Sequence, residues 1–254
     1  MNDASKPATT LDTVLGGRVM LHQPAVGYRV AIDPILLAAA CPAEPGDTVV
    51  DLGCGVGTAA LCLTRRVPDV RCIGVDLQAD LTDLAERNAR ENHLADRVRF
   101  LAGDILDRAL PIYAQPSDHA VVNPPYLKRG TATPSDNPQK ALANVEGEAD
   151  LAAWVAAAVR ATRPGGTITF IHRADRLPEL LALLGARCGG LVTQPLHPKA
   201  GAAAHRAIVA GRLDQRLPAI MLPGLIVHEA DGRFSPLLER VLRDGAALPM
   251  IVET

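Results

Sequence analysis

The sequence predicts an α/β protein built on a doubly wound, mostly parallel sheet. From residue 48 onward, short apolar segments alternate with amphipathic helical segments, and this alternation is typical of strand–helix–strand units. The chain of 254 residues is 48% hydrophobic and 21% charged, which is the composition of a globular protein and not of a disordered one. At roughly 150 residues per domain, this length allows one large domain with small appendages.

The alternating elements can be placed along the chain by their periodicity. Strands are expected at 48–52, 70–75, 98–101, 119–122 and 167–171. Helices are expected at 58–66, 79–91, 151–162 and 177–184. The second of these helices has Leu81, Leu84, Ala85 and Asn88 on one face. Two further apolar runs predict an antiparallel hairpin, at 191–196 and 207–213.

Residues 1–47 are expected to form a small hairpin and a helix that pack on the core. The two strands of the hairpin would be joined by a turn at 24–27 and would lie at 18–22 and 28–32. The helix would span 33–40, with Asp33 as its N-cap, because Pro34 suits the first helical position.

The remaining chain divides into a central domain at 48–213 and a C-terminal extension at 214–254. The extension contains a strand-like run at 224–229 and an amphipathic helix at 236–243. Within the central domain, the stretch 128–148 is polar and irregular. Loops of this length inside a compact domain are usually functional or disordered, so this one is expected to cover the substrate.

The composition excludes several classes of protein. The longest uncharged apolar run, 151–159, is far shorter than the roughly 20 residues of a membrane span. The first residues form neither a basic patch nor an apolar block, so no secretory signal is expected. The five cysteines include no CxxC pair and are expected to be buried thiols in a reducing compartment. We therefore expect a cytoplasmic protein without a zinc ribbon.

Charge is distributed unevenly along the chain. The net charge is −2, yet residues 155–216 contain nine Arg or Lys residues against three acidic ones. Such an excess indicates either solvated helix faces or a surface that contacts phosphates. Lys199, His205 and Arg206 flank the predicted hairpin and are the candidates for phosphate contacts.

Two single residues have plain structural interpretations. Trp154, the only tryptophan, lies among alanines in a predicted helix and is expected in the core. His172 ends the fifth predicted strand, where it would be a polar strand terminus or would face a cleft.

A glycine-rich turn joins the first predicted strand to its helix. Residues 49–58 read Val-Val-Asp-Leu-Gly-Cys-Gly-Val-Gly-Thr. Glycines let the backbone approach a ligand closely, and the following helix N-terminus offers free N–H groups. The spacing differs from that of a dinucleotide site, and Asp51 would repel a phosphate. The turn suits a ligand with an ammonium group, unless it is purely structural.

Two carboxylates follow the next two predicted strands. Asp76 lies 19 positions after Gly57, where a carboxylate can accept hydrogen bonds from both hydroxyls of a ribose. The same residue can cap the following helix, and the two roles are compatible. Asp104 follows Gly103 and can either accept a hydrogen bond from an adenine amino group or cap its loop.

The most specific motif is Asn123-Pro124-Pro125-Tyr126, which follows the fourth predicted strand. The two prolines remove two backbone donors and leave the carbonyl of Pro124 rigid, without an obvious internal partner. Asn123 adds an amide oxygen, and Tyr126 adds an aromatic face. Two acceptors and a stacking surface form a site for a planar NH₂ group, such as adenine N6 or a carboxamide. A turn stiffened by prolines would need neither the asparagine nor the tyrosine.

In this order and spacing, the motifs resemble those of class I S-adenosylmethionine-dependent methyltransferases, in particular the branch that carries Asn-Pro-Pro-Tyr and methylates planar amino groups. The resemblance covers 48–213. It implies a seven-stranded Rossmann-like sheet, mostly parallel, whose last strand is antiparallel. The N-terminal segment is similar to a narrower family, the bacterial adenine-N6 methyltransferases of valine tRNA, at Gly16, Gly17, Arg18, Val19, Gln23, Pro24, Gly27, Tyr28, Arg29, Asp33, Leu36 and Leu37.

This resemblance implies S-adenosylmethionine as the cofactor and assigns roles to the motif residues. The residues that would hold the methionine end are Asp51, Gly53, Gly55 and Gly57. Asp76 would bind the ribose. The residues around the adenine would be Leu77 and Ile105 on its two faces and Asp104 at its amino group. Asn123, the carbonyl of Pro124 and Tyr126 would hold the target amine, with Asn123 also next to the cofactor.

The resemblance also implies an RNA substrate, most often tRNA, and no need for a metal. Substrate contacts are expected from Tyr28, Arg29, Lys199 and Arg206. Four alternatives remain open. Release-factor-type glutamine N5-methyltransferases carry a helical domain before the core, and DNA adenine methyltransferases carry a target-recognition domain. Guanine-N2 enzymes more often have Phe where Tyr126 stands. A non-catalytic cofactor-binding module would keep the same motifs without turnover.

Overall fold

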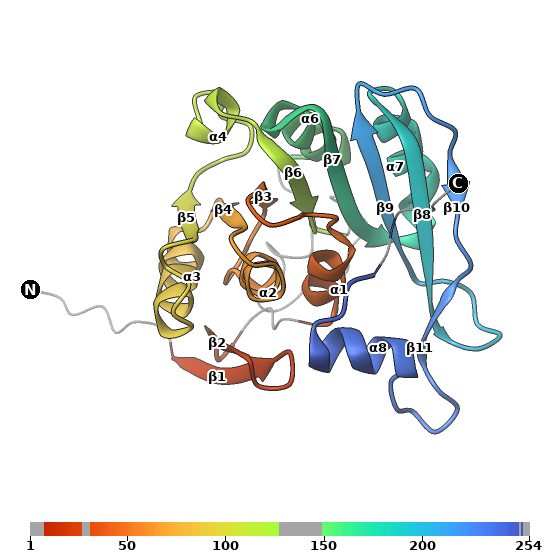
Figure 1. Cartoon of the computed structure of the whole chain (residues 1–254), viewed down its shortest axis with the longest axis horizontal. Helices are drawn as coiled ribbons and strands as arrows, with labels where there is room; N and C mark the ends of the chain where they lie inside the picture. Colours follow the sequence, from red (N-terminus) through yellow and green to blue (C-terminus); the bar gives the residue numbers. More distant parts are fainter. Residues whose placement is uncertain (1–7, 27–30, 127–148, 249, 251–254) are drawn as a thin grey trace, which may run out of the picture.

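The computed structural model describes residues 8–26, 31–126, 149–248 and 250. A nine-stranded sheet forms the centre of this part of the chain (Figure 1). The strand order is β5-β4-β3-β6-β7-β9-β8-β10, and β11 also pairs with β8. The seven strands that the sequence predicts for the central domain are β3 (Thr48–Leu52), β4 (Arg71–Asp76), β5 (Val98–Ala102), β6 (Ser117–Val122), β7 (Thr162–Arg173), β8 (Cys188–Lys199) and β9 (Arg206–Leu213).

Strand directions confirm the predicted fold class. Each strand is parallel to the next in the order β5, β4, β3, β6 and β7. β9 is antiparallel to both β7 and β8, as expected for the last strand of the central domain. The extension adds two short strands parallel to β8, namely β10 (Ile220–Met221) and β11 (Leu225–His228). The second was predicted and the first was not.

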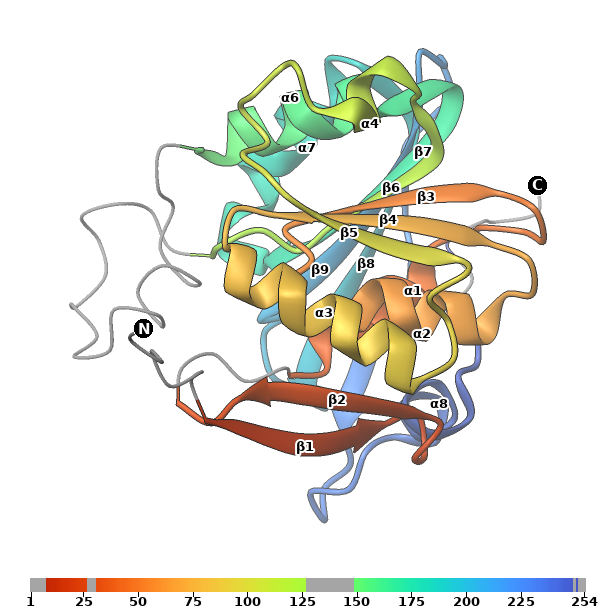
Figure 2. The same cartoon turned by 90° about the vertical axis from the view of Figure 1, so that its left-hand side faces the viewer.

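Helices cover both faces of the sheet (Figure 2). One face carries α1 (Asp33–Ala40), α2 (Thr58–Arg66) and α3 (Ala79–Glu91), all at their predicted positions. The other carries α4 (Pro111–Ala114), which was not predicted, α6 (Leu151–Ala161) and α7 (Leu177–Gly185). Each face has its own core because strand side chains alternate: Val49 of β3 belongs to one core, and Val50 and Leu52 belong to the other.

The extension ends in a helical segment rather than one regular helix. α8 (Pro236–Glu239) continues as a single π-helical turn at Arg240–Asp244. Gly245 ends this segment with a φ of 65°. The π-helical turn packs against α1, so this part of the extension lies beside a helix from the N-terminal segment (Figure 1).

The N-terminal hairpin exists, but its predicted pairing was wrong. β2 (Val19–Pro24) overlaps the expected first strand at 19–22, yet it pairs with β1 (Thr9–Val14), which precedes it. The turn lies at Leu15, Gly16 and Gly17, which have φ values of 51°, 63° and 89°. Two glycines adopt the left-handed conformation easily, so this turn was preferred over the expected one at 24–27. Most of the expected return strand at 28–32 lies outside the described residues, and Ile32 is not in a strand.

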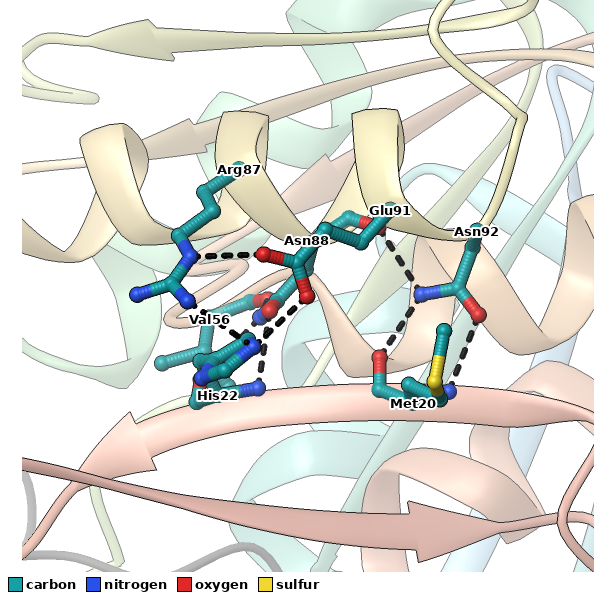
Figure 3. A network of polar contacts seen from close by, with 7 residues as sticks. All are labelled: Met20, His22, Val56, Arg87, Asn88, Glu91 and Asn92. Carbon is teal, nitrogen blue, oxygen red and sulfur yellow. Dashed lines mark hydrogen bonds and ion pairs between the residues drawn. The ribbon is translucent and has the colours of Figure 1, made fainter.

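Two asparagines, Asn88 of α3 and its C-cap residue Asn92, dock this hairpin onto the core (Figure 3). Asn92 accepts a hydrogen bond from the backbone N–H of Met20 at 2.9 Å and donates to its carbonyl at 2.7 Å. Asn88 makes the same pair with His22, at 2.8 and 3.1 Å. Residues four apart on a helix rise by about 6 Å, and residues two apart on a strand by about 6.8 Å. The two amides therefore occupy the place of a neighbouring strand at the edge of β2.

The predicted N-cap of α1 was wrong as well. Ile32 flanks the helix, and Asp33 already lies within it, with no side-chain capping bond. The carboxylate of Asp33 points instead to partners from two distant parts of the chain, as shown below.

Two expectations from composition can be compared with the structure. All five cysteines are buried thiols, as predicted. Among the residues that the structure describes, none of the helices is long and apolar enough to cross a bilayer.

Candidate active site

The predicted motifs meet at one edge of the sheet. The glycine-rich loop follows β3, Asp76 ends β4, Asp104 follows β5 and Asn123 follows β6. Because these four strands are parallel neighbours, their carboxyl ends lie side by side. This edge is where open α/β sheets bind their ligands.

The glycine-rich loop is folded back on the end of β4. The carbonyl of Val75 accepts hydrogen bonds from the N–H groups of Gly53 at 2.8 Å and Cys54 at 3.1 Å. Gly57 has a φ of 85°, and a Cβ there would lie 2.5 Å from the ring of Phe100. Gly55 has a φ of 54°, but a Cβ there would meet nothing within 4 Å. The loop is thus packed tightly on its inner side and open at Gly55, as the close approach of a ligand requires.

Asp76 holds this loop in place. One carboxylate oxygen accepts a hydrogen bond from the N–H of Gly55 at 2.9 Å, and the other accepts one from Gln78 at 3.0 Å. Burial raises the pKa of Asp76. A carboxylate offers about four lone pairs, and Leu77 also contributes a backbone hydrogen bond, so acceptor capacity remains for a ribose hydroxyl.

Asp51 is buried beneath the loop. It accepts a hydrogen bond from the N–H of Ala60 at 3.2 Å. Burial raises its pKa to about 7, and the nearby charge of Asp76 adds to this effect. A buried carboxyl of this kind gains from a cationic partner, which fits the ammonium group of the expected ligand.

The residues expected around the adenine differ in exposure. Leu77 is 63% exposed, whereas Ile105 is buried. Asp104 accepts a hydrogen bond from the N–H of Leu106 at 2.8 Å, so it caps its loop as one of its two predicted roles requires. The exposed apolar side chain of Leu77, directly after Asp76, is suited to packing against the flat face of an adenine ring. The residues of this edge therefore fit S-adenosylmethionine.

Tyr126 is held by two acceptors at the other half of the site. Its hydroxyl lies 2.6 Å from Oδ1 of Asn123 and 2.6 Å from Oδ2 of Asp33. Asp33 is only 1% exposed and forms an ion pair with Arg206, whose Nε lies 2.5 Å from the same oxygen. The guanidinium group of Arg206 also lies over the ring of Tyr126, 5.9 Å from its centroid.

His172 packs against the ring of Tyr126 from the end of β7. The two ring centroids are 5.5 Å apart, at an interplanar angle of 68°. Burial, together with the charge of Arg176, lowers the pKa of His172 to about 4. Its Nδ1 accepts a hydrogen bond from the N–H of Arg173 at 2.8 Å. His172 is therefore neutral near pH 7, with its proton on Nε2.

A pocket of about 430 Å³ opens beside this cluster. Its walls are formed by Tyr126, Arg173, Asp175, Ala204, His205 and Arg206. Arg173 is paired with Asp175 at 2.5 Å. Among the described residues, no group of three or more His, Cys, Asp or Glu side chains is arranged to hold a metal ion.

Comparison with known proteins identifies the family. A methyltransferase-domain family matches residues 49–146. The tRNA1(Val) (adenine(37)-N6)-methyltransferase of Porphyromonas gingivalis is 30% identical over 232 residues, which is 86% of this chain and 89% of the relative. The chain belongs to the tRNA1(Val) (adenine(37)-N6)-methyltransferase family.

Two further proteins, one curated relative and one solved structure, are similar to this chain. The release factor glutamine methyltransferase of Chlorobaculum tepidum is 31% identical, but over only 59% of this chain and 54% of the relative. The crystal structure of a predicted O-methyltransferase from Agrobacterium tumefaciens has a TM-score of 0.71 and 25% identity, and it covers 87% of this chain and 100% of the other. Methyltransferases with this fold have been solved with S-adenosylmethionine bound. S-adenosylmethionine is the cofactor of this methyltransferase.

The expected contacts of the substrate are only partly visible in this methyltransferase. Arg206 and His205 line the pocket, and Lys199 is exposed at the end of β8. Tyr28, Arg29 and the loop 128–148 lie outside the described residues. Trp154 is buried, as predicted, and its ring would lie 2.9 Å from a Cβ at Gly53. Its ring therefore packs against the glycine-rich loop at Gly53.

Sequence reasoning undervalued two residues of this site. Asp33 was expected to cap a helix or to line the mouth of the site, and His172 was expected to be a polar strand end or to face a cleft. The only sequence signal for Asp33 is that a charged residue opens an otherwise apolar helix. His172 is preceded by six buried residues of β7, and a polar residue that continues such an apolar strand is a further signal that could have been used.

Proposed function

We propose that the protein transfers a methyl group from S-adenosylmethionine to N6 of an adenine in tRNA, and that adenine 37 of valine tRNA, named for its relatives, is the target. The observation that carries this proposal is the position of Asn123-Pro124-Pro125-Tyr126. This motif lies directly beside the glycine-rich loop, because β6 pairs with β3. The acceptors for an amine and the site for the methyl donor therefore share one edge.

The protein's contribution to transfer is positioning and electrostatics. When bound, S-adenosylmethionine supplies an electrophilic methyl group on a positively charged sulfur. An exocyclic adenine amine is a poor nucleophile, because its lone pair is delocalised into the ring. Asn123 Oδ1 and the Pro124 carbonyl would accept hydrogen bonds from its two N–H groups and favour a tetrahedral nitrogen. The same acceptors would stabilise the positive charge that develops on the nitrogen. Its proton can be lost to water afterwards, so no general base is required.

Two observations favour tRNA over a glutamine side chain. The match to the tRNA-modifying relative extends over 86% of the chain, whereas the match to the glutamine methyltransferase stops at 59%. The pocket beside Tyr126 is also lined by Arg173 and Arg206, and each of these arginines keeps N–H groups beyond those that face its paired carboxylate. Cationic side chains next to a target base suit the phosphates that flank it. A stacked base would be flipped out of its loop against the ring of Tyr126.

The test uses S-adenosylmethionine with a labelled methyl group. Wild-type protein is incubated with unmodified tRNA, ribosomal RNA and a release factor in parallel, and the products are digested and identified by mass spectrometry. We expect label in N6-methyladenosine from tRNA, at position 37 of valine tRNA. Label in N5-methylglutamine would replace this proposal with the release-factor function, and label in none of the three would contradict it.

Asn123→Ala serves as the control in the same experiment. It removes one acceptor for the amine but none of the contacts of the glycine-rich loop. We expect transfer to be lost while the dissociation constant of S-adenosylmethionine stays within about twofold of wild type. Loss of cofactor binding in this variant would contradict the role given to Asn123.

A further inference from the structure

The hydroxyl of Tyr126 has one proton and two acceptors. Oδ2 of Asp33 and Oδ1 of Asn123 both lie 2.6 Å from the Tyr126 oxygen. One O–H group can donate to only one of them at this distance, so the other contact needs a donor of its own. Asp33 is buried at 1% exposure, so the choice is made inside the protein and not by solvent.

The carboxylate is the stronger acceptor of the two. Arg206 lies 2.5 Å from the same oxygen of Asp33 and presents Asp33 to Tyr126 as an ion-paired carboxylate. Hydrogen bonds to an ionised acceptor are roughly twice as strong as those to a neutral one. The Tyr126 proton therefore belongs to Asp33. The Tyr126 oxygen then acts as an acceptor, toward Arg206, which also contacts the hydroxyl, and toward the amide of Asn123.

The amide of Asn123 can satisfy this arrangement in only one orientation. The nitrogen and oxygen of an amide are distinguished by their hydrogen-bonding partners. An oxygen facing the Tyr126 lone pairs would be repelled, whereas the Nδ2 group can donate to them. With Nδ2 toward Tyr126, Oδ1 occupies the opposite position, where it can accept from a substrate amine.

We propose that Asp33 is a positioning residue that fixes the orientation of the Asn123 amide through the hydroxyl of Tyr126. The chain of contacts runs from Arg206 to Asp33, from Asp33 to the Tyr126 hydroxyl, and from that hydroxyl to Asn123. This inference rests on the proposed function only for the identity of the group beyond Oδ1, which is the target amine.

This orientation of the Asn123 amide favours a substrate group that donates a hydrogen bond. An amine offers two N–H groups, and Oδ1 of Asn123 can accept one of them. The reversed amide would present its own N–H groups to the amine and would oppose it. His172 supports the arrangement, because its ring packs edge-on against Tyr126 at 5.5 Å and helps to fix the position of the Tyr126 ring.

The experiment is a double-mutant cycle with Asp33→Asn and Tyr126→Phe. The first removes the ionised acceptor and keeps the size of the side chain, and the second removes only the hydroxyl. We expect each to lower kcat for methyl transfer to tRNA about 10- to 100-fold, as expected for the loss of one hydrogen bond to a charged group. The dissociation constant of S-adenosylmethionine stays unchanged. Because both residues act through one contact, the double variant loses no more than the more impaired single variant.

A matched control is available at the opposite edge of the sheet. There Asp118 pairs with Arg163 at 2.6 Å and accepts from the hydroxyl of Thr48 at 2.7 Å. This is the same set of chemical groups, far from Asn123, since Asp118 lies near the start of β6. Asp118→Asn is expected to keep the wild-type kcat. Additive losses in the cycle, or a loss in Asp118→Asn as large as in Asp33→Asn, would overturn the proposal.

A second measurement is independent of methyl transfer. In protein labelled with ¹⁵N-asparagine, the side-chain amide of Asn123 is identified by its absence in Asn123→Ala. We expect its hydrogens to exchange slowly in the wild type and faster in both Asp33→Asn and Tyr126→Phe. Equal exchange in all three would refute the orientation by Asp33. If the wild type methylates no tRNA, the proposed function fails, and this measurement still decides the role of Asp33.

Discussion

At the scale of single residues, Asp51 is a buried carboxyl group for which we propose contact with the ammonium group of S-adenosylmethionine. Burial raises its pKa to about 7, so Asp51 is neutral below this pH and a carboxylate above it. A carboxylate attracts the ammonium group of S-adenosylmethionine and a neutral acid does not. The affinity for S-adenosylmethionine should therefore rise as the pH increases from 5.5 to 7, by at most about tenfold per unit. Isothermal titration calorimetry over this range would measure the effect.

The variant Asp51→Asn distinguishes the titration of Asp51 from that of Asp76. This is needed because burial also raises the pKa of Asp76. The variant keeps an oxygen that can accept from Ala60 and lacks the titrating group. Its affinity should be low, and its pH dependence should be flatter than that of the wild type. Equal slopes in the two proteins would assign the titration to another group and remove Asp51 from the binding of the ammonium.

At the scale of elements, Asn88 of α3 and its C-cap residue Asn92 have different roles. Both tie the backbone of β2 to the helix, but Asn88 also donates to the carbonyl of Val56 at 3.0 Å, within the glycine-rich loop (Figure 3). Asn88→Ala and Asn92→Ala should each lower the free energy of unfolding by about 1–3 kcal/mol, because backbone groups lose their partners. Only Asn88→Ala should also weaken the binding of S-adenosylmethionine.

Chemical denaturation and calorimetry on the same two variants test this division. Asn92→Ala is the matched control, since it loses an equivalent pair of backbone contacts without touching the loop. Equal cofactor affinities in both variants would show that the hairpin and the cofactor loop are independent. A stability loss confined to one variant would contradict the strand-like docking of both amides.

The elements that sequence could predict are those with local signals. α2 and α3 have the predicted bounds because their apolar periodicity, the glycine turn before α2 and the strands that flank both are all local. The partner of β2 could not be chosen, since both the segment before it and the segment after it have a suitable turn. The role of Asp33 depends on Tyr126 and Arg206, which lie 93 and 173 positions away. The residues next to Asp33 in the sequence do not indicate that it contacts Tyr126 and Arg206.

At the scale of the whole molecule, the fold uses most of the basic excess within itself. Of the nine cationic residues in 155–216, five are paired with carboxylates: Arg163, Arg173, Arg176, Arg187 and Arg206. Two of those carboxylates, Asp33 and Asp118, come from other parts of the chain. The charge of this segment, read from sequence alone, therefore overstates what it can offer to phosphates.

Position decides what the remaining charges of this segment can do. Lys199 ends β8, which runs in the same direction as β7 because both are antiparallel to β9. It therefore lies at the edge that carries Asn123, whereas Arg212 pairs with Thr167 toward the other edge. Lys199→Ala should weaken tRNA binding severalfold and reduce the slope of log K against log salt by about one. Arg212→Ala, an equally exposed cation, should change neither quantity when both are measured by fluorescence anisotropy. Equal losses would mean that tRNA does not approach from the active-site edge, and a flat salt response of the wild type would argue against a nucleic acid altogether.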